Sequence, residues 1–185
     1  TIIASGPSAT KADASIAGAN SRIITVNRSY ELTAGEINYG CDCSYLARHY
    51  EKAQKSGAEV WTIDRDAALR FGLNHIGFKS GRGLCLDPGF IYPGTNSGYQ
   101  AVQLAFQMGA ARIVLLGFDM TTARGSHWHG DHENGLANAV GSERWAHDFS
   151  QLAIDLEQQG VEVINASRHT ALKCFKRSTV DKIWN

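Results

Sequence analysis

The residues with the clearest chemical potential in this sequence are three histidines and an aspartate within one short run. His127, His129, Asp131 and His132 all lie between Ser126 and His132. Imidazole nitrogens and carboxylate oxygens are ligands that zinc and other borderline divalent metals accept. The run therefore predicts a divalent metal site, or a contact with substrate or phosphate that needs no metal. A polar surface loop with neither role is the third interpretation.

Two turns of small residues form a second candidate group. Ser5-Gly6-Pro7-Ser8 follows the first expected strand, and Asn96-Ser97-Gly98 opens an expected helix. Backbone N–H groups and the helix dipole at such positions favour a bound phosphate. Neither turn has the GxGxxG or Walker A pattern, which argues against a standard NAD site or P-loop. We expect both turns to contact a nucleotide.

The elements that must position these groups alternate along the chain. Short runs rich in Ile and Val alternate with helical patterns, as in βα units around a parallel sheet. Strands are expected at about 2–4, 22–26, 36–40, 59–63, 75–79, 112–117 and 161–164, and helices at 44–56, 97–108 and 143–159, each helix followed by a glycine. The predicted fold is α/β: a Rossmann-like three-layer fold with a mostly parallel central sheet.

In such a sheet, ligands bind beyond the carboxyl ends of the strands. Asn27 and Asp119 each follow an expected strand. Asp64-Arg65-Asp66 also follows a strand and matches the DxD pattern of many glycosyltransferases, although Asp64 serves equally well as a helix N-cap. The strand ends therefore define one candidate edge of the sheet.

Length and composition limit the classes of protein. The chain has 185 residues, with 18 Lys and Arg against 18 Asp and Glu. We expect a single domain over 1–185 with a long His-rich loop at about 120–141. Zero net charge gives no indication of nucleic-acid binding, and no apolar run is long enough to span a membrane. The four cysteines form no CxxC pair, so we expect reduced thiols and a cytoplasmic location.

Several of these motifs together carry a family resemblance. The segments Ile2-Ile3-Ala4-Ser5-Gly6-Pro7-Ser8, Val26-Asn27, Asn96-Ser97-Gly98 and Ala111 to Asp119 look like the nucleotide-binding half of bacterial CMP-sialic-acid sialyltransferases. They also resemble 6-hydroxymethylpterin diphosphokinase-like proteins and, above all, small phage-encoded uncharacterised proteins with a His-rich loop. The resemblance covers roughly residues 1–175. It implies nucleotide binding near Gly6, Ser8, Asn27, Ser97 and Gly98, and the turns add Ser5, Pro7 and Asn96 to the expected nucleotide contacts. A bacteriophage protein would act in the host cytoplasm.

The resemblance also implies a general-base histidine after the Gly117-Phe118-Asp119 strand. His147 lies in that neighbourhood, but its helical phase points it away from the apolar stripe that contains Trp145. We therefore expect His132 to act as the base, together with Asp119 as a second catalytic residue.

Three functions remain open at this point. The first is a nucleotide-binding transferase, glycosyltransferase-like, with a CMP- or UDP-linked sugar donor. The second is a metal-dependent hydrolase that uses His127, His129, Asp131 and His132 to activate water. The third is a non-catalytic phage binding or assembly protein. An oligomer is compatible with all three.

Overall fold

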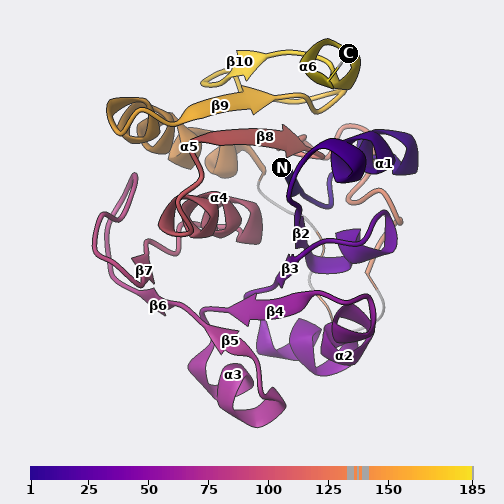
Figure 1. The fold of residues 1–185 in the computed structure, drawn as a ribbon, viewed down its shortest axis with the longest axis vertical. Helices are drawn as coiled ribbons and strands as arrows, with labels where there is room; N and C mark the ends of the chain where they lie inside the picture. The colour runs from indigo at the N-terminus through magenta and orange to yellow at the C-terminus, as the bar shows by residue number, and fades with distance from the viewer. Residues whose placement is uncertain (133–135, 137, 139–141, 185) are drawn as a thin grey trace.

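One parallel sheet organises the molecule. The computed structural model describes residues 1–132, 136, 138 and 142–184, with 142–144 only in their backbone. In this part of the chain, eight strands pair in the order β10-β9-β8-β1-β2-β3-β4-β5 (Figure 1). The strands are β1 (Ile2–Ile3), β2 (Ile24–Val26), β3 (Ile37–Tyr39), β4 (Glu59–Thr62), β5 (Asn74–His75), β8 (Arg112–Leu116), β9 (Glu162–Asn165) and β10 (Lys176–Arg177). A separate two-stranded sheet pairs β6 (Gly77–Phe78) with β7 (Phe90–Ile91).

Helices cover both faces of the large sheet. They are α1 (Lys11–Asn20), α2 (Cys43–Lys55), α3 (Arg65–Phe71), α4 (Ser97–Gln107), α5 (Ser142–Gln158) and α6 (Val180–Trp184), with a 3-10 turn η1 (Asn27–Glu31) after β2. Figure 1 shows α4 and α5 on the opposite side of the sheet from α1 and α2. The predicted α/β class with a Rossmann-like, three-layer arrangement is confirmed.

Alternation along the central strands divides their apolar side chains between the two faces of the sheet. Ile2 and Leu115 face α4 and α5, whereas their neighbours Ile3 and Leu116 face α1 and α6. Successive side chains of a strand point to opposite faces, so a central strand needs apolar residues at every position. This is why the strands appear in the sequence as continuous apolar runs.

Helix α4 is buried over most of its length, as its sequence predicts. All residues from Ser97 to Ala105 are buried. Its two buried amides are paired: Gln100 accepts a hydrogen bond from Tyr39 Oη (2.9 Å), and Gln103 Nε2 donates to the Tyr92 carbonyl (2.6 Å). These bonds fix α4 against β3 and against the segment that follows β7.

The order of the strands reverses at β1. From β1 the chain proceeds through β2 to β5 in one direction, and it returns at β8 on the other side of β1. Ile2 pairs with Ile24 of β2 and with Leu115 of β8. The carboxyl ends of β1 and β8 therefore form the crevice where doubly wound sheets bind ligands.

The structure differs from the sequence-based prediction in the short strands. In place of the single strand expected at 75–79, the structure has two strands. β5 belongs to the large sheet and β6 to the small one, with buried Ile76 between them. Strands β7 and β10 were not predicted, because two residues carry no readable alternation. The predicted loop at 120–141 lies partly outside the described residues. Among the described helices, none is long and apolar enough to cross a membrane, and all four cysteines are free thiols.

Candidate functional site

A cleft of about 470 Å³ opens at the carboxyl ends of the central strands. Its described wall combines the β1 turn, the start of α4, the end of β8 and the histidine run. The predicted residues on this wall are Ser5, Gly6, Pro7, Asn27, Asn96, Ser97, Gly98, Asp119, His127 and His132. The two small-residue turns and two of the histidines thus share one cavity, although up to 127 positions separate them in the sequence.

The β1 turn packs directly against Asp119. Ser8 donates from its backbone N–H and its hydroxyl to the two oxygens of the Asp119 carboxylate, at 3.0 and 2.7 Å. A Cβ at Gly6 would overlap this carboxylate and the Gly117 carbonyl oxygen. Burial raises the pKa of Asp119, while the hydrogen bonds from Ser8 oppose that shift. In this arrangement Asp119 holds the turn, and its catalytic role stays a prediction.

The same turn has few hydrogen-bond donors left for a phosphate. Gly6 N–H donates to the Gly117 carbonyl and Ala9 N–H to the Gly6 carbonyl. Ser8 N–H is taken by Asp119, and Pro7 has no N–H. Helix α1 begins only at Lys11, capped by Thr10. The turn therefore shapes the wall of the cleft.

The start of α4 is better placed to bind an anion. Asn96 caps the helix by accepting a hydrogen bond from Tyr99 N–H at 2.9 Å. The first residues, Ser97 and Gly98, have backbone N–H groups without acceptors inside the helix. A Cβ at Gly98 would lie 3.0 Å from the Phe118 ring, so only glycine fits without displacing that ring. The helix dipole adds positive potential at this point of the cleft.

Two asparagines present unused amide groups at the cleft. Asn27 has a left-handed backbone (φ 51°), and its carbonyl accepts a hydrogen bond from Asn38 Nδ2 at 2.8 Å. Within the described part of the chain, Asn27 Oδ1 and Asn96 Nδ2 are buried without a hydrogen-bond partner. An unpaired buried polar group costs about 1–3 kcal/mol. Asn27 and Asn96 therefore each leave one polar side-chain atom available for a further hydrogen bond.

Sequence reasoning did not select Cys41 and Tyr45, which also line the cleft. Burial raises the pKa of the Cys41 thiol to about 12, so the group is a protonated thiol near pH 7. Its sulfur lies 3.1 Å from Ser97 Oγ. The sequence does place Cys41 directly after an expected strand, whereas nothing there distinguishes Tyr45 from a core aromatic residue.

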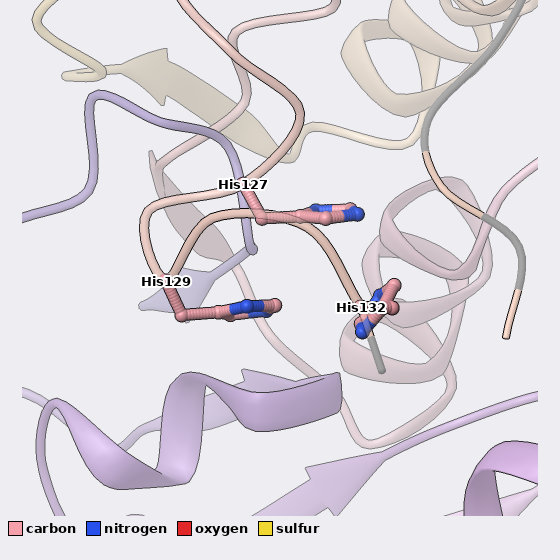
Figure 2. Close-up of side chains that lie close together, drawn as sticks. All are labelled: His127, His129 and His132. Carbon is pink, nitrogen blue, oxygen red and sulfur yellow. The ribbon is translucent and has the colours of Figure 1, made fainter. Parts of the chain in front are cut away.

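Figure 2 shows the three histidine rings close together, and His127 and His132 line the cleft. His127, His129 and His132 each offer a ring nitrogen, and these atoms all lie within 4.8 Å of one another. The rings of His127 and His129 stack with centroids 5.1 Å apart. The backbone N–H of Trp128 donates a hydrogen bond to the Ser5 carbonyl at 3.0 Å, which connects the histidine run to the β1 turn. Asp131, predicted as a fourth ligand, is exposed and does not belong to this described group.

Burial keeps the imidazoles of His127 and His129 neutral near pH 7. It lowers the pKa of His127 to about 4, assisted by the charge of His132 and opposed by a hydrogen bond to the Ser5 backbone. It lowers the pKa of His129 to about 4 as well, assisted by Arg28. Among the described residues, neither nitrogen of His129 has a hydrogen-bond partner, nor does His127 Nε2.

Positive side chains are missing from the described wall. The described lining residues include no Lys or Arg. Arg28, which lies near His129, forms a two-bond ion pair with Glu31 at 2.9 Å for each bond. An anionic ligand would therefore find backbone N–H groups but no described side-chain cation on the lining.

Two other candidates lie away from the cleft. Asp64 caps α3 by accepting a hydrogen bond from Ala67 N–H at 2.9 Å, so the DxD-like segment performs a structural task. His147 is exposed on α5.

Three comparisons with known proteins were made. No protein-family model matches the chain, and no curated protein or solved structure matches it. The resemblance to sialyltransferases and to phage proteins therefore stays a prediction. The chemistry of the cleft must carry the functional argument.

Proposed function

We propose that this chain is a nucleotide-binding transferase, glycosyltransferase-like, whose cleft holds a CMP- or UDP-linked sugar. One observation carries the proposal. Asn27 Oδ1 and Asn96 Nδ2, an acceptor and a donor, are buried without partners among the described residues, beside the open end of α4. This combination suits a ligand that has both polar edges and a phosphate.

Each part of a nucleotide has a counterpart in the cleft. The phosphate fits the N-terminus of α4, where Ser97 and Gly98 offer N–H groups. Asn27 Oδ1 can accept from a ribose hydroxyl or a base amino group, and Asn96 Nδ2 can donate to a carbonyl or phosphate oxygen. The proposal rests on this match of donors and acceptors at the strand-order reversal.

His132 supplies the base in this proposal. Its ring lies on the cleft wall, where a neutral imidazole accepts the proton of an acceptor hydroxyl as that oxygen attacks the sugar carbon and the bond to the nucleotide phosphate breaks. The role requires a free nitrogen lone pair. It therefore applies only while His132 is not a metal ligand.

The histidine group favours a second candidate function, metal-dependent hydrolysis. Three imidazoles that offer nitrogens within 4.8 Å of one another could hold a metal that activates water. The two functions differ in product. A hydrolase releases free sugar from a nucleotide sugar in water alone, whereas a transferase forms a glycoside only when an acceptor is present.

The first experiment is a thermal-shift screen of the full chain with CMP, UDP, GDP and ATP. A nucleotide at 100 times its Kd adds about 2.7 kcal/mol to the free energy of unfolding. For a chain of this size, that raises Tm by roughly 5–10 °C. Failure of every nucleotide to shift Tm would remove the transferase proposal. Binding without turnover of any nucleotide sugar would favour the non-catalytic interpretation.

A matched pair of variants locates the site. Asn27→Asp keeps a side chain that tolerates the left-handed backbone, but it adds a negative charge to the cleft, which repels an anionic nucleotide. We expect nucleotide affinity to fall about tenfold, which is about 1.4 kcal/mol. Asn74→Asp, on exposed β5, is the control and should bind as the wild type does. Equal titration curves for the two variants would place the nucleotide elsewhere.

A further inference from the structure

Two of the three histidines have ring nitrogens that no hydrogen bond among the described residues accounts for. His127 and His129 together bury three ring nitrogens without a partner among the described residues. Each of the three residues directs one nitrogen toward the others, as Figure 2 shows, and the ligand atoms lie within 4.8 Å. Buried polar atoms normally have partners, and a neutral imidazole has one lone pair, so the unpaired nitrogens allow one metal-ligating lone pair on each of His127 and His129.

We propose that His127, His129 and His132 bind one Zn²⁺ ion and leave its fourth position open toward the cleft. Three histidines and one exchangeable position are a common ligand set of zinc sites. His127 and His132 line the cleft and His129 lies behind them, next to η1. The open position therefore faces the cavity.

The geometry allows this ion after a small adjustment. Zn–N bonds of about 2.0–2.1 Å at tetrahedral angles place ligand nitrogens about 3.4 Å apart. The nitrogens must therefore approach by about 1.4 Å from the largest observed separation. All three belong to one six-residue run, so side-chain rotation can supply the movement while the Trp128–Ser5 backbone bond stays in place.

The surroundings of His127 match those of a metal ligand. Metal-bound histidines usually direct their second nitrogen to a carbonyl or carboxylate, which orients the ring. His127 Nε2 is unpartnered among the described residues, and the ring makes a hydrogen bond to the Ser5 backbone. The β1 turn, which packs on Asp119, would thus also orient a metal ligand.

The ion would supply the positive charge that the described wall lacks. Neutral imidazoles leave the full charge of Zn²⁺ available to a fourth ligand, and the described lining includes no Lys or Arg. We infer that the fourth ligand is a phosphate oxygen of the nucleotide, an inference that rests on the proposed function. In the zinc-loaded protein, His132 is then a ligand and no longer the base.

Metal binding is tested first without any nucleotide. The full chain is stripped with a chelator and titrated with ZnCl₂ by calorimetry, and with Co²⁺ by visible spectroscopy. We expect one Zn²⁺ per chain and a Co²⁺ spectrum typical of tetrahedral nitrogen coordination. A chain that binds no zinc, or whose Co²⁺ spectrum is that of the aquo ion, overturns the site.

Two variants assign the ligands. His129→Ala should weaken zinc binding at least about 100-fold, because loss of an outer hydrogen bond alone costs 10–100-fold. His147→Ala, an exposed histidine on α5, should bind as the wild type does. Circular dichroism and the Tm of the metal-free proteins test whether both variants fold. If His129→Ala does not fold, His127→Gln is used in its place. Equal zinc affinity in ligand and control variants overturns the assignment.

The nucleotide is added last, with and without one equivalent of Zn²⁺. We expect zinc to increase nucleotide affinity at least tenfold in the wild type and to leave it unchanged in His129→Ala. Zinc binding without any nucleotide binding would reject the proposed function and leave the metal site standing. Nucleotide binding that zinc does not strengthen would overturn the phosphate role of the ion.

Discussion

Gly6 controls the wall of the cleft because it has no side chain. Its backbone N–H donates to the Gly117 carbonyl at 2.9 Å, and a Cβ would overlap both that carbonyl and the Asp119 carboxylate. These neighbours are backbone and a buried, hydrogen-bonded side chain, so they cannot move aside cheaply. A single added methyl group should therefore separate the β1 turn from β8.

We predict that Gly6→Ala lowers the free energy of unfolding by about 3 kcal/mol, the upper range for overpacking a tight site. It should also weaken nucleotide binding, because Ser5 and Pro7 line the cleft. The measurement is urea unfolding together with a nucleotide titration. Gly57→Ala is the control: its φ of 91° makes alanine unfavourable by about 1 kcal/mol, but the added carbon meets no atom. Equal losses in both variants would refute the role of the contact.

At the residue level, local sequence pattern selected several of the residues that line the cleft, and their functional roles stay predictions. Asn27, Ser97 and Gly98 could be selected because they follow a strand or open a helix, and these positions are defined by local pattern. Asp131 could not be separated from its histidine neighbours, since only the loop conformation turns it to solvent. Tyr45 reaches the cleft by tertiary packing, which leaves no local signal.

At the level of elements, an ion pair joins α1 to the segment after β9. Arg168 donates two hydrogen bonds to the Asp13 carboxylate, at 2.7 and 2.9 Å. Burial alone would raise the pKa of Asp13, but the hydrogen bonds from Arg168 and Thr10 and the charge of Arg168 outweigh it and lower the pKa. The pair thus fastens the N-terminal helix to the C-terminal part of the sheet.

We predict that Asp13→Asn lowers the free energy of unfolding at pH 7 by about 1 kcal/mol, a value limited by the exposure of Arg168. The carboxylate binds protons less readily in the folded than in the unfolded chain. Its contribution is therefore complete above the unfolded pKa of about 3.9 and disappears as pH falls through the lower folded pKa. Urea midpoints of wild type and variant should converge below pH 3. A constant difference across that range would contradict the ion-pair account.

The elements themselves were predictable to different degrees. Helices 44–56, 97–108 and 143–159 lie within one residue of α2, α4 and α5 at each end, because glycines mark where they stop. The pair β6 and β7 is held instead by contacts such as Gly77 against the Phe90 ring, where a Cβ would lie 2.7 Å from the ring. Such contacts join segments that are separate in the sequence, so a local sequence pattern does not predict them.

At the level of the whole molecule, the strand at the N-terminal end of the sequence needs the second half of the chain. β1 lies between β2 and β8, and both of its residues are buried. Helix α1 packs in a core shared with Val114, Leu116 and Val180. The first five strands therefore cannot complete their core alone.

We predict that a fragment of residues 1–110 shows no cooperative thermal unfolding by circular dichroism. It lacks β8, so Ile2 and Ile3 lose their pairing with Leu115 and Leu116 and are exposed at a sheet edge. A fragment of residues 1–178, which lacks only α6, is the control and should unfold cooperatively at a lower temperature than the full chain. A cooperative transition in the shorter fragment would show that the N-terminal half folds independently.

The lack of a Lys or Arg on the described wall of the cleft also has a kinetic consequence. Rapid capture of an anion usually depends on a field of Lys and Arg that steers it, and such association slows as salt screens the field. The described lining offers no such cation, in a chain of zero net charge. In the metal-free protein, the association rate of a nucleotide should therefore hardly change with ionic strength. Salt should slow nucleotide association only in the zinc-loaded protein, where the ion adds two positive charges at the cleft.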